Sequence, residues 1–284
     1  MVEPEGGVGG LGTSAATVAV LAISLMSLWR SVYRIRTRSN DVWGVSNVEE
    51  VVLGGCVHDN LLFVYRLVVF AFSAIVTAVH YRMKGHKPLR FYTKWNFYLL
   101  TLYFGLVVWE TYWFKRRTAK NRVHPFGPGS YVAIILYHIN MTTIWTVDLG
   151  TWTVLYPHAC KNAALADMCR QFILNFFSYV EHLANAFLML GELFMNRMPF
   201  FDHLRGQVGI WVVSYVFWSF VYHLHTGMWV YPFANTTKAW SPFVYLATFF
   251  AHFCAYRIFH LLHWVKNQTL LRDRVWPETL LKED

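Results

Sequence analysis

The chain has 284 residues, of which 56% are hydrophobic and only 14% are charged, and its formal net charge is +9. Soluble globular proteins carry about 25% charged residues, so this composition excludes an ordinary soluble domain and indicates a membrane protein. The basic residues lie in short stretches between apolar segments, where they set orientation in a bilayer. The positive charge therefore gives no reason to expect nucleic acid as a partner.

The N-terminal quarter differs from the rest of the chain. Residues 1–14 are Gly-rich, which predicts a disordered N-terminus. The first apolar segment, 15–33, is short, because Arg30 interrupts it. We expect it either to span the bilayer or to lie at the interface. Residues 34–59 have no hydrophobic periodicity, which predicts a polar connector.

Six longer apolar segments follow the connector, and each approaches or exceeds the roughly 20 residues that a spanning helix needs. They lie at 60–80, 91–114, 131–156, 172–195, 209–233 and 241–265. The sequence therefore predicts an all-α integral membrane bundle of six or seven transmembrane helices, in which residues 60–265 form a six-helix domain.

The flanks of these segments predict an orientation. Lys and Arg favour the cytoplasmic side, which places the C-terminus and the polar tail, 266–284, in the cytoplasm. The expected location is an endomembrane (endoplasmic reticulum or Golgi) or the plasma membrane. Cys160 and Cys169 share the loop between the fourth and fifth of the seven segments. This topology makes that loop lumenal or extracellular, where a disulfide is permitted.

The fifth segment carries a line of polar residues inside a membrane-length apolar run. They are Gln171, Asn175, Ser178, His182, Asn185 and Glu192. Residues three, four and seven apart share one face of a helix, so we expect all six on one side. Lipid cannot solvate them, and the stripe must face protein or an aqueous cavity.

Hydrogen bonding between helices is the simplest role for such groups, and it is worth about 0.6–2 kcal/mol per contact. That role accounts for most Ser, Thr and Asn residues here. It accounts less well for the histidines and Glu192, because ionisable groups at membrane depth usually have a function.

Three stretches resemble the rolling-stone family of multipass proteins and the related androgen-induced membrane hydrolases. They are RFYTKWN at 90–96, EHLAN at 181–185 and TGMWVYPF at 226–233. Their order and spacing are also similar, over about residues 60–265. In the androgen-induced branch a membrane threonine and a histidine hydrolyse fatty acid esters of hydroxy fatty acids. By position, the resemblance implies Thr93 and His182 in these roles.

This chemistry makes specific demands on the structure. A threonine hydroxyl is a poor nucleophile that needs a neighbouring base, which a neutral His182 can supply. An ester carbonyl also needs oxyanion donors, and Asn96, Asn185 and Tyr231 are candidates by residue type.

The depths of Thr93 and His182 in the membrane restrict whether the two side chains can meet. Thr93 lies near the outer end of its segment, whereas His182 lies about ten residues into its own. We expect them to meet only if the third segment begins deeper, near Pro88, which suits a first helical turn. Hydrogen-bonding distance between them would support catalysis.

Two other functions stay open. A metal or haem site could use His223 and His225, but residues two apart on a helix point about 200° apart. His260 and His263 have a better spacing but lie near a segment end. We therefore expect no metal and no cofactor.

The second alternative is a non-enzymatic membrane protein of the rolling-stone type, with an adhesion, ligand-binding or transport role. The expected partners are the lipid bilayer and, for the hydrolase, a lipid ester; the sequence gives no oligomeric state.

Overall fold

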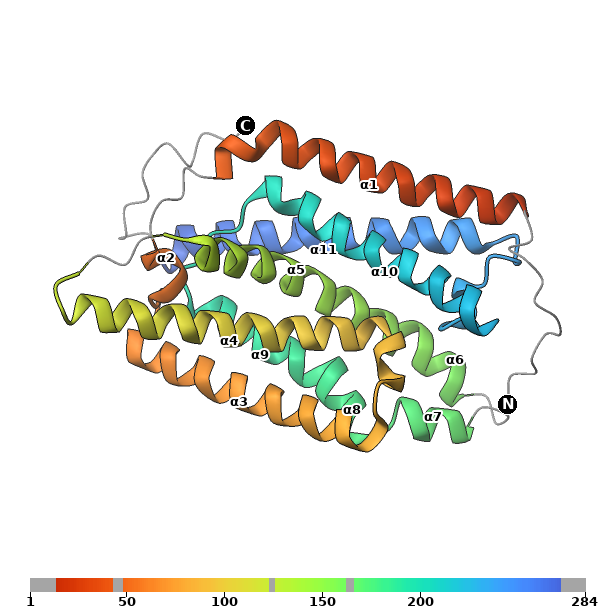
Figure 1. The fold of residues 1–284 in the computed structure, drawn as a ribbon, viewed down its shortest axis with the longest axis horizontal. Coiled ribbons are helices and arrows are strands. Elements are labelled where there is room, and N and C mark those ends of the chain that lie inside the picture. Colours follow the sequence, from red (N-terminus) through yellow and green to blue (C-terminus); the bar gives the residue numbers. More distant parts are fainter. Residues whose placement is uncertain (1–13, 43–47, 123–125, 162–165, 272–284) are drawn as a thin grey trace.

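The computed structural model describes residues 14–42, 48–122, 126–161 and 166–271, which form helices joined by short connections (Figure 1). The long helices are α1 (Ala15–Val42), α3 (Asp59–Lys84), α4 (Tyr92–Thr118), α5 (Pro128–Gly150), α10 (Arg205–Thr226) and α11 (Ser241–Thr269). Shorter ones are α2 (Glu49–Val52), α6 (Tyr156–Cys160), α7 (Ala166–Phe172), α8 (Phe176–Tyr179) and α9 (Asn185–Met195). Two π-helical turns, η2 (Thr151–Leu155) and η4 (Val180–Ala184), and three 3₁₀ turns, η1 (Lys87–Arg90), η5 (Asp202–Leu204) and η6 (Pro232–Ala234), complete the order.

The helix ends follow local signals in the sequence. α5 has Pro128 in its first turn, where the missing N–H costs nothing. α8 begins after Asn175, whose side chain accepts a hydrogen bond from the Ser178 amide at 3.0 Å. α10 ends at Gly227, which adopts the left-handed conformation (φ 68°) that glycine reaches without strain. These signals fix where α5 and α8 begin and where α10 ends, and so the depth of the side chains that follow or precede them.

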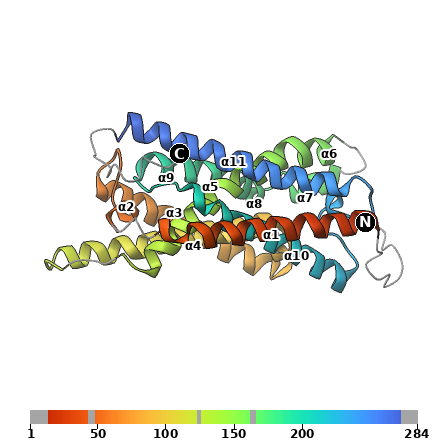
Figure 2. The ribbon, with the colours of Figure 1, turned by 90° about the horizontal axis from the view of Figure 1, so that it is seen from above.

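The long helices lie side by side along the longest axis of the molecule in both views (Figures 1 and 2). α5 is central and packs against α4, α9, α10 and α11, while α4 also packs along α3. α1 packs against α10 and α11. A Cβ at Gly206 of α10 would lie 2.6 Å from the Ser31 carbonyl oxygen of α1, so the small residue permits this close approach.

Five helical segments are long and apolar enough to cross a membrane among the described residues: 15–37, 59–84, 128–155, 202–226 and 241–269. Their outer faces carry exposed apolar side chains such as Ile75, Phe243 and Phe250. These features indicate a multipass membrane protein with an all-α bundle. The expectation of six or seven spans also counted α4 and the α8–η4–α9 helix. These two carry the buried charged residues Lys94, Glu110, Glu181 and Glu192, which lower their mean hydropathy.

The structure differs from the sequence-based boundaries in three places. The sixth apolar segment was expected to reach residue 233, but α10 ends at Thr226. α1 continues to Val42 and α2 occupies Glu49–Val52, so part of the expected polar connector is helical. The fifth apolar segment does not run unbroken from 172, because α7 ends at Phe172 and α8 begins at Phe176. The expected disordered residues 1–13 and most of the polar tail (272–284) lie outside the described residues.

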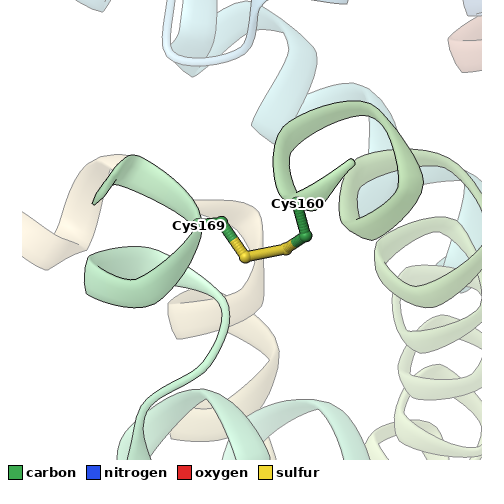
Figure 3. Close-up of a disulfide and its surroundings, with 2 residues drawn as sticks. All are labelled: Cys160 and Cys169. Atoms are coloured by element: carbon green, nitrogen blue, oxygen red, sulfur yellow. A yellow bond between two sulfur atoms is a disulfide. The ribbon is translucent and has the colours of Figure 1, made fainter. Parts of the chain in front are cut away.

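Cys160 of α6 and Cys169 of α7 form a disulfide, with Cα atoms 5.1 Å apart (Figure 3). The bond joins two short helices at one end of the bundle (Figure 1). The sequence permitted this disulfide without requiring it, and the structure contains it.

Candidate functional site

Thr93, His182 and Asp148 lie in line on three different helices. The Thr93 Oγ1 atom is 3.3 Å from Nε2 of His182, and Nδ1 of the same ring is 3.4 Å from Oδ1 of Asp148. Thr93 and Asp148 are buried, and the His182 side chain is 11% exposed. Hydroxyl, imidazole and carboxylate in this order form the arrangement that activates a hydroxyl nucleophile. We call these three residues the Thr93 centre.

Helix starts bring the two motif residues to the same height. α4 begins at Tyr92, so Thr93 is in its first turn, and Pro88 belongs to the separate turn η1. The expectation that the third segment begins near Pro88 is therefore wrong. The depth mismatch is smaller than expected, because α8 begins at Phe176 and His182 is only six residues into it, or about 9 Å.

The surroundings of the His182 imidazole are made by two π-helical turns, one of which contains His182 itself. His182 lies in η4, and η2 supplies Thr151 and Trp152. The Thr151 hydroxyl is 3.1 Å from His182 Nδ1, and the Trp152 indole donates to the His182 carbonyl oxygen at 2.7 Å. π-Helical turns are rare and frequently occur at functional sites.

A buried ion pair lies directly beside the Thr93 centre. Lys94 donates to Glu181, and both side chains are about 5% exposed. His80 of α3 contacts Lys94 and lies 3.3 Å from the Glu181 carboxylate. Since Lys94 follows Thr93 and Glu181 precedes His182, two adjacent contacts fix α4 against η4.

The three candidate oxyanion donors are not equivalent. Asn185 donates to the Glu181 carbonyl oxygen at 2.6 Å and to Asp148 Oδ1 at 3.4 Å, so it orients the carboxylate instead. The Asn96 oxygen accepts from the Trp211 indole at 2.9 Å, and its amide nitrogen has no hydrogen-bond partner among the described residues.

Tyr231 is the candidate donor nearest to the threonine. Its hydroxyl accepts from the Tyr92 amide at 3.1 Å and interacts with Thr93. Burial raises the pKa of the Tyr231 phenol, so it stays protonated and can donate a hydrogen bond. Tyr231 thus contacts Thr93, Asn96 has an amide nitrogen without a partner among the described residues, and the Asn185 amide is engaged with Glu181 and Asp148.

Sequence reasoning missed Asp148 and Thr151. Asp148 was visible as the one acidic residue in the apolar segment 131–156, where a charge is costly and usually functional. Thr151 gave no such signal, because a threonine in an apolar helix ordinarily bonds to its own backbone.

The polar stripe of the fifth segment divides between two sites. Gln171 is exposed on α7, and Asn175 caps α8. Glu192 lies at the far end of α9, where it accepts from Arg66 at 2.6 Å and from Tyr103 at 2.8 Å. Arg66 and Glu192 are both fully buried. We call this pair the Arg66 centre.

The histidines outside the Thr93 centre are mostly engaged with protein. His263 contacts the Tyr137 hydroxyl at 2.8 Å and the Phe259 carbonyl at 2.7 Å. His138 accepts from the Phe201 amide at 2.7 Å. Across the part of the chain that the structure describes, no group of three or more His, Cys, Asp or Glu side chains is placed to hold a metal ion.

Comparison of the chain with protein-family models, with curated proteins and with solved structures finds no match.

Proposed function

We propose that this protein is an intramembrane hydrolase of a lipid ester, with Thr93 as nucleophile and His182 as general base. The observation that carries the proposal is the Thr93–His182–Asp148 alignment, at 3.3 Å and 3.4 Å. The three motif stretches, which resemble the androgen-induced hydrolases, suggest a fatty acid ester of a hydroxy fatty acid as substrate.

The proposed reaction has two steps. Thr93 Oγ1 attacks the ester carbonyl while its proton passes to His182 Nε2, which then protonates the departing alcohol. Water next attacks the acyl-threonine, with His182 again as base, and the fatty acid leaves. Asp148 holds the ring so that Nδ1 carries the proton and Nε2 can accept one. The Tyr231 hydroxyl and the Asn96 amide are the proposed oxyanion donors.

An apolar hollow lies on the side of α4 that faces away from Thr93, and its apolar lining suits an acyl chain. It has a volume of about 400 Å³ and is lined by Leu89, Trp95, Tyr98, Leu99, Leu102, Trp211 and Trp218. Trp211 in its wall donates to Asn96, which lies one helical turn from Thr93. An acyl chain in this hollow would lie in an apolar environment along α4.

The test is covalent labelling of the purified protein with a long-chain alkyl fluorophosphonate, combined with hydrolysis of a defined fatty acid ester in mixed micelles. We expect wild type to label and to hydrolyse the ester. Thr93→Ala and His182→Ala should lose both, and Asp148→Asn should reduce the hydrolysis rate by about 10²–10⁴-fold, because the ring then adopts the wrong tautomer.

Thr143→Ala is the matched control, because Thr143 is equally buried and bonds only to the Ile139 carbonyl of its own helix. Thermal unfolding of each variant in detergent verifies folding. Wild type that neither labels nor hydrolyses, or Thr93→Ala that labels as strongly as Thr143→Ala, would refute the hydrolase.

The second candidate is a non-enzymatic membrane protein, in which the same residues fasten α4 to the α8–η4–α9 helix. The Lys94–Glu181 pair favours it, because a buried ion pair next to Thr93 and His182 fixes the two helices without any chemistry. It predicts that Thr93→Ala lowers the unfolding temperature while wild type shows no turnover.

A further inference from the structure

Three arginines from three helices converge on one carboxylate at the end of the bundle where α10 begins. Asp202 of η5 contacts Arg34 of α1 at 2.9 Å, Arg257 of α11 at 3.0 Å and Arg205 of α10 at 3.4 Å. We call these four residues the arginine cluster. Its formal charge is +2, because one carboxylate faces three guanidinium groups.

The cluster is open to the surroundings. The side chains of Arg34 and Arg257 are 34% and 53% exposed, and that of Asp202 is 26% exposed. Each guanidinium has five N–H donors, and the bonds to Asp202 use one from each arginine. Donors and positive charge are therefore left over for a further anion.

The cluster lies at the height expected for lipid headgroups. α10 has 22 residues and is about 33 Å long, close to the roughly 30 Å thickness of a hydrocarbon core. Arg205 begins this helix and Asp202 lies one turn before it. On α1, the apolar run ends at Arg30, one turn before Arg34. Arg257 lies inside the apolar segment of α11, and its contact with Asp202 brings it to the same height as Arg34 and Arg205.

Apolar side chains border the cluster on the membrane side. The Arg205 guanidinium lies over the Phe253 ring, 5.2 Å from its centroid, and Phe253 is 44% exposed. Phe250 on the same helix is 64% exposed, and Ile258 next to Arg257 is 57% exposed. A ligand with an anionic head and acyl chains would contact both surfaces, whereas a free anion would use only the first.

We propose that the arginine cluster binds the phosphate headgroup of an anionic phospholipid in the adjacent leaflet. Basic pockets between transmembrane helices at the headgroup level have this chemistry. The site is separate from the Thr93 centre, and the proposal does not depend on ester hydrolysis. The lipid would join α1 to α10 and α11 through its phosphate.

The test uses the full chain in detergent, titrated with dioleoyl phosphatidic acid or dioleoyl phosphatidylcholine and analysed by native mass spectrometry. We expect tighter binding of phosphatidic acid by wild type. Arg257→Gln should weaken that binding about fivefold, because a basic residue near an anionic lipid is worth about a factor of five. Arg117→Gln, which removes an exposed arginine of α4, is the matched control and should leave binding within twofold.

The Asp202→Asn variant distinguishes a lipid-binding site from a set of ion pairs that only holds the three helices together. Removing the competing carboxylate should strengthen phosphatidic acid binding if the arginines receive phosphate, and should weaken or leave it unchanged if they only hold Asp202. Equal binding of the two lipids by wild type, or equal loss in Arg257→Gln and Arg117→Gln, would overturn the proposal. Displacement of phosphatidic acid by millimolar inorganic phosphate would also overturn it, in favour of a soluble anion.

Discussion

Glu50, on the short helix α2, is a half-buried residue whose Oε2 atom is buried and has no hydrogen-bond partner among the described residues. Burial raises the pKa of Glu50 from 4.5 to about 7, with the neighbouring Glu49 adding to the effect and Arg197 opposing it. The folded protein therefore holds this proton more tightly than the unfolded chain does.

The consequence is a pH-dependent stability with a definite sign. The contribution of Glu50 is fully present below pH 4.5 and is lost as the pH rises through about 7. Glu50→Gln should be more stable than wild type at pH 8, by at most about 3 kcal/mol, and similar to it at pH 5. Unfolding temperatures at both pH values test this. Glu49→Gln is the exposed control, and an equal gain in that variant at pH 8 would contradict the assignment.

Individual site residues could be predicted only where a short stretch of sequence around them carries the information. The short motifs identified Thr93 and His182, and the contact between them supports that pairing. Asp148 comes from another helix, and its place beside His182 depends on how α5 packs, which no spacing within one segment reveals. Asn185 was assigned by residue type alone, and in the structure its amide nitrogen bonds to Glu181 and Asp148.

At the scale of helices, the Arg66 centre joins elements that are distant in sequence. Arg66 of α3 pairs with Glu192 of α9, donates to the Val51 carbonyl of α2 at 2.9 Å, and reaches Thr111 of α4 at 3.4 Å. A buried pair gains little over an apolar pair of similar size, but a single buried charge without its partner is strongly unfavourable.

The double variant should therefore be more stable than the sum of the two single losses predicts. Arg66→Met and Glu192→Leu should each destabilise the bundle by about 3–5 kcal/mol, because each leaves an uncompensated buried charge. The double variant should recover most of that loss. Unfolding of all four proteins in one detergent measures the coupling. Additive losses would mean that the two side chains act independently.

The helices themselves were largely predictable, and their ends were not. Each of the seven apolar segments contains a helix, because length and apolar composition leave a chain in lipid few other ways to satisfy its backbone. The break between α7 and α8 depends on the Asn175 cap and on the disulfide at Cys169, which hydropathy does not register. The π-helical turns depend on contacts between helices, as with Thr151 and His182.

For the whole molecule, the cysteines provide a test of orientation. The disulfide between Cys160 and Cys169 joins α6 and α7 at one end of the bundle, and α2 lies at the opposite end (Figure 1). Cys56 is exposed and free, and it lies between α2 and the start of α3. A disulfide forms in an oxidising compartment, so we expect its end to be lumenal or extracellular and Cys56 to face the cytoplasm.

Sealed membrane vesicles of known orientation permit the measurement. A membrane-impermeant maleimide should label Cys56 only from the cytoplasmic side, and Cys56→Ser should abolish that labelling. Reduction should make Cys160 and Cys169 reactive from the other side alone. Labelling of Cys56 and of the reduced pair from the same side would refute a bundle that crosses the membrane in this way.

The π-helical turn η4 changes the angle between the Thr93 centre and the Arg66 centre on one continuous helix. His182 lies within the turn, and Glu192 follows about three helical turns later on α9. A π turn holds one residue more than an α turn, so it rotates everything after it by about 100° relative to a regular helix. Leu183 is 46% exposed, and little packing depends on its side chain. The extra residue therefore changes the angle between His182 and Glu192 on this helix. It allows the imidazole to contact α4 and the carboxylate to contact α3.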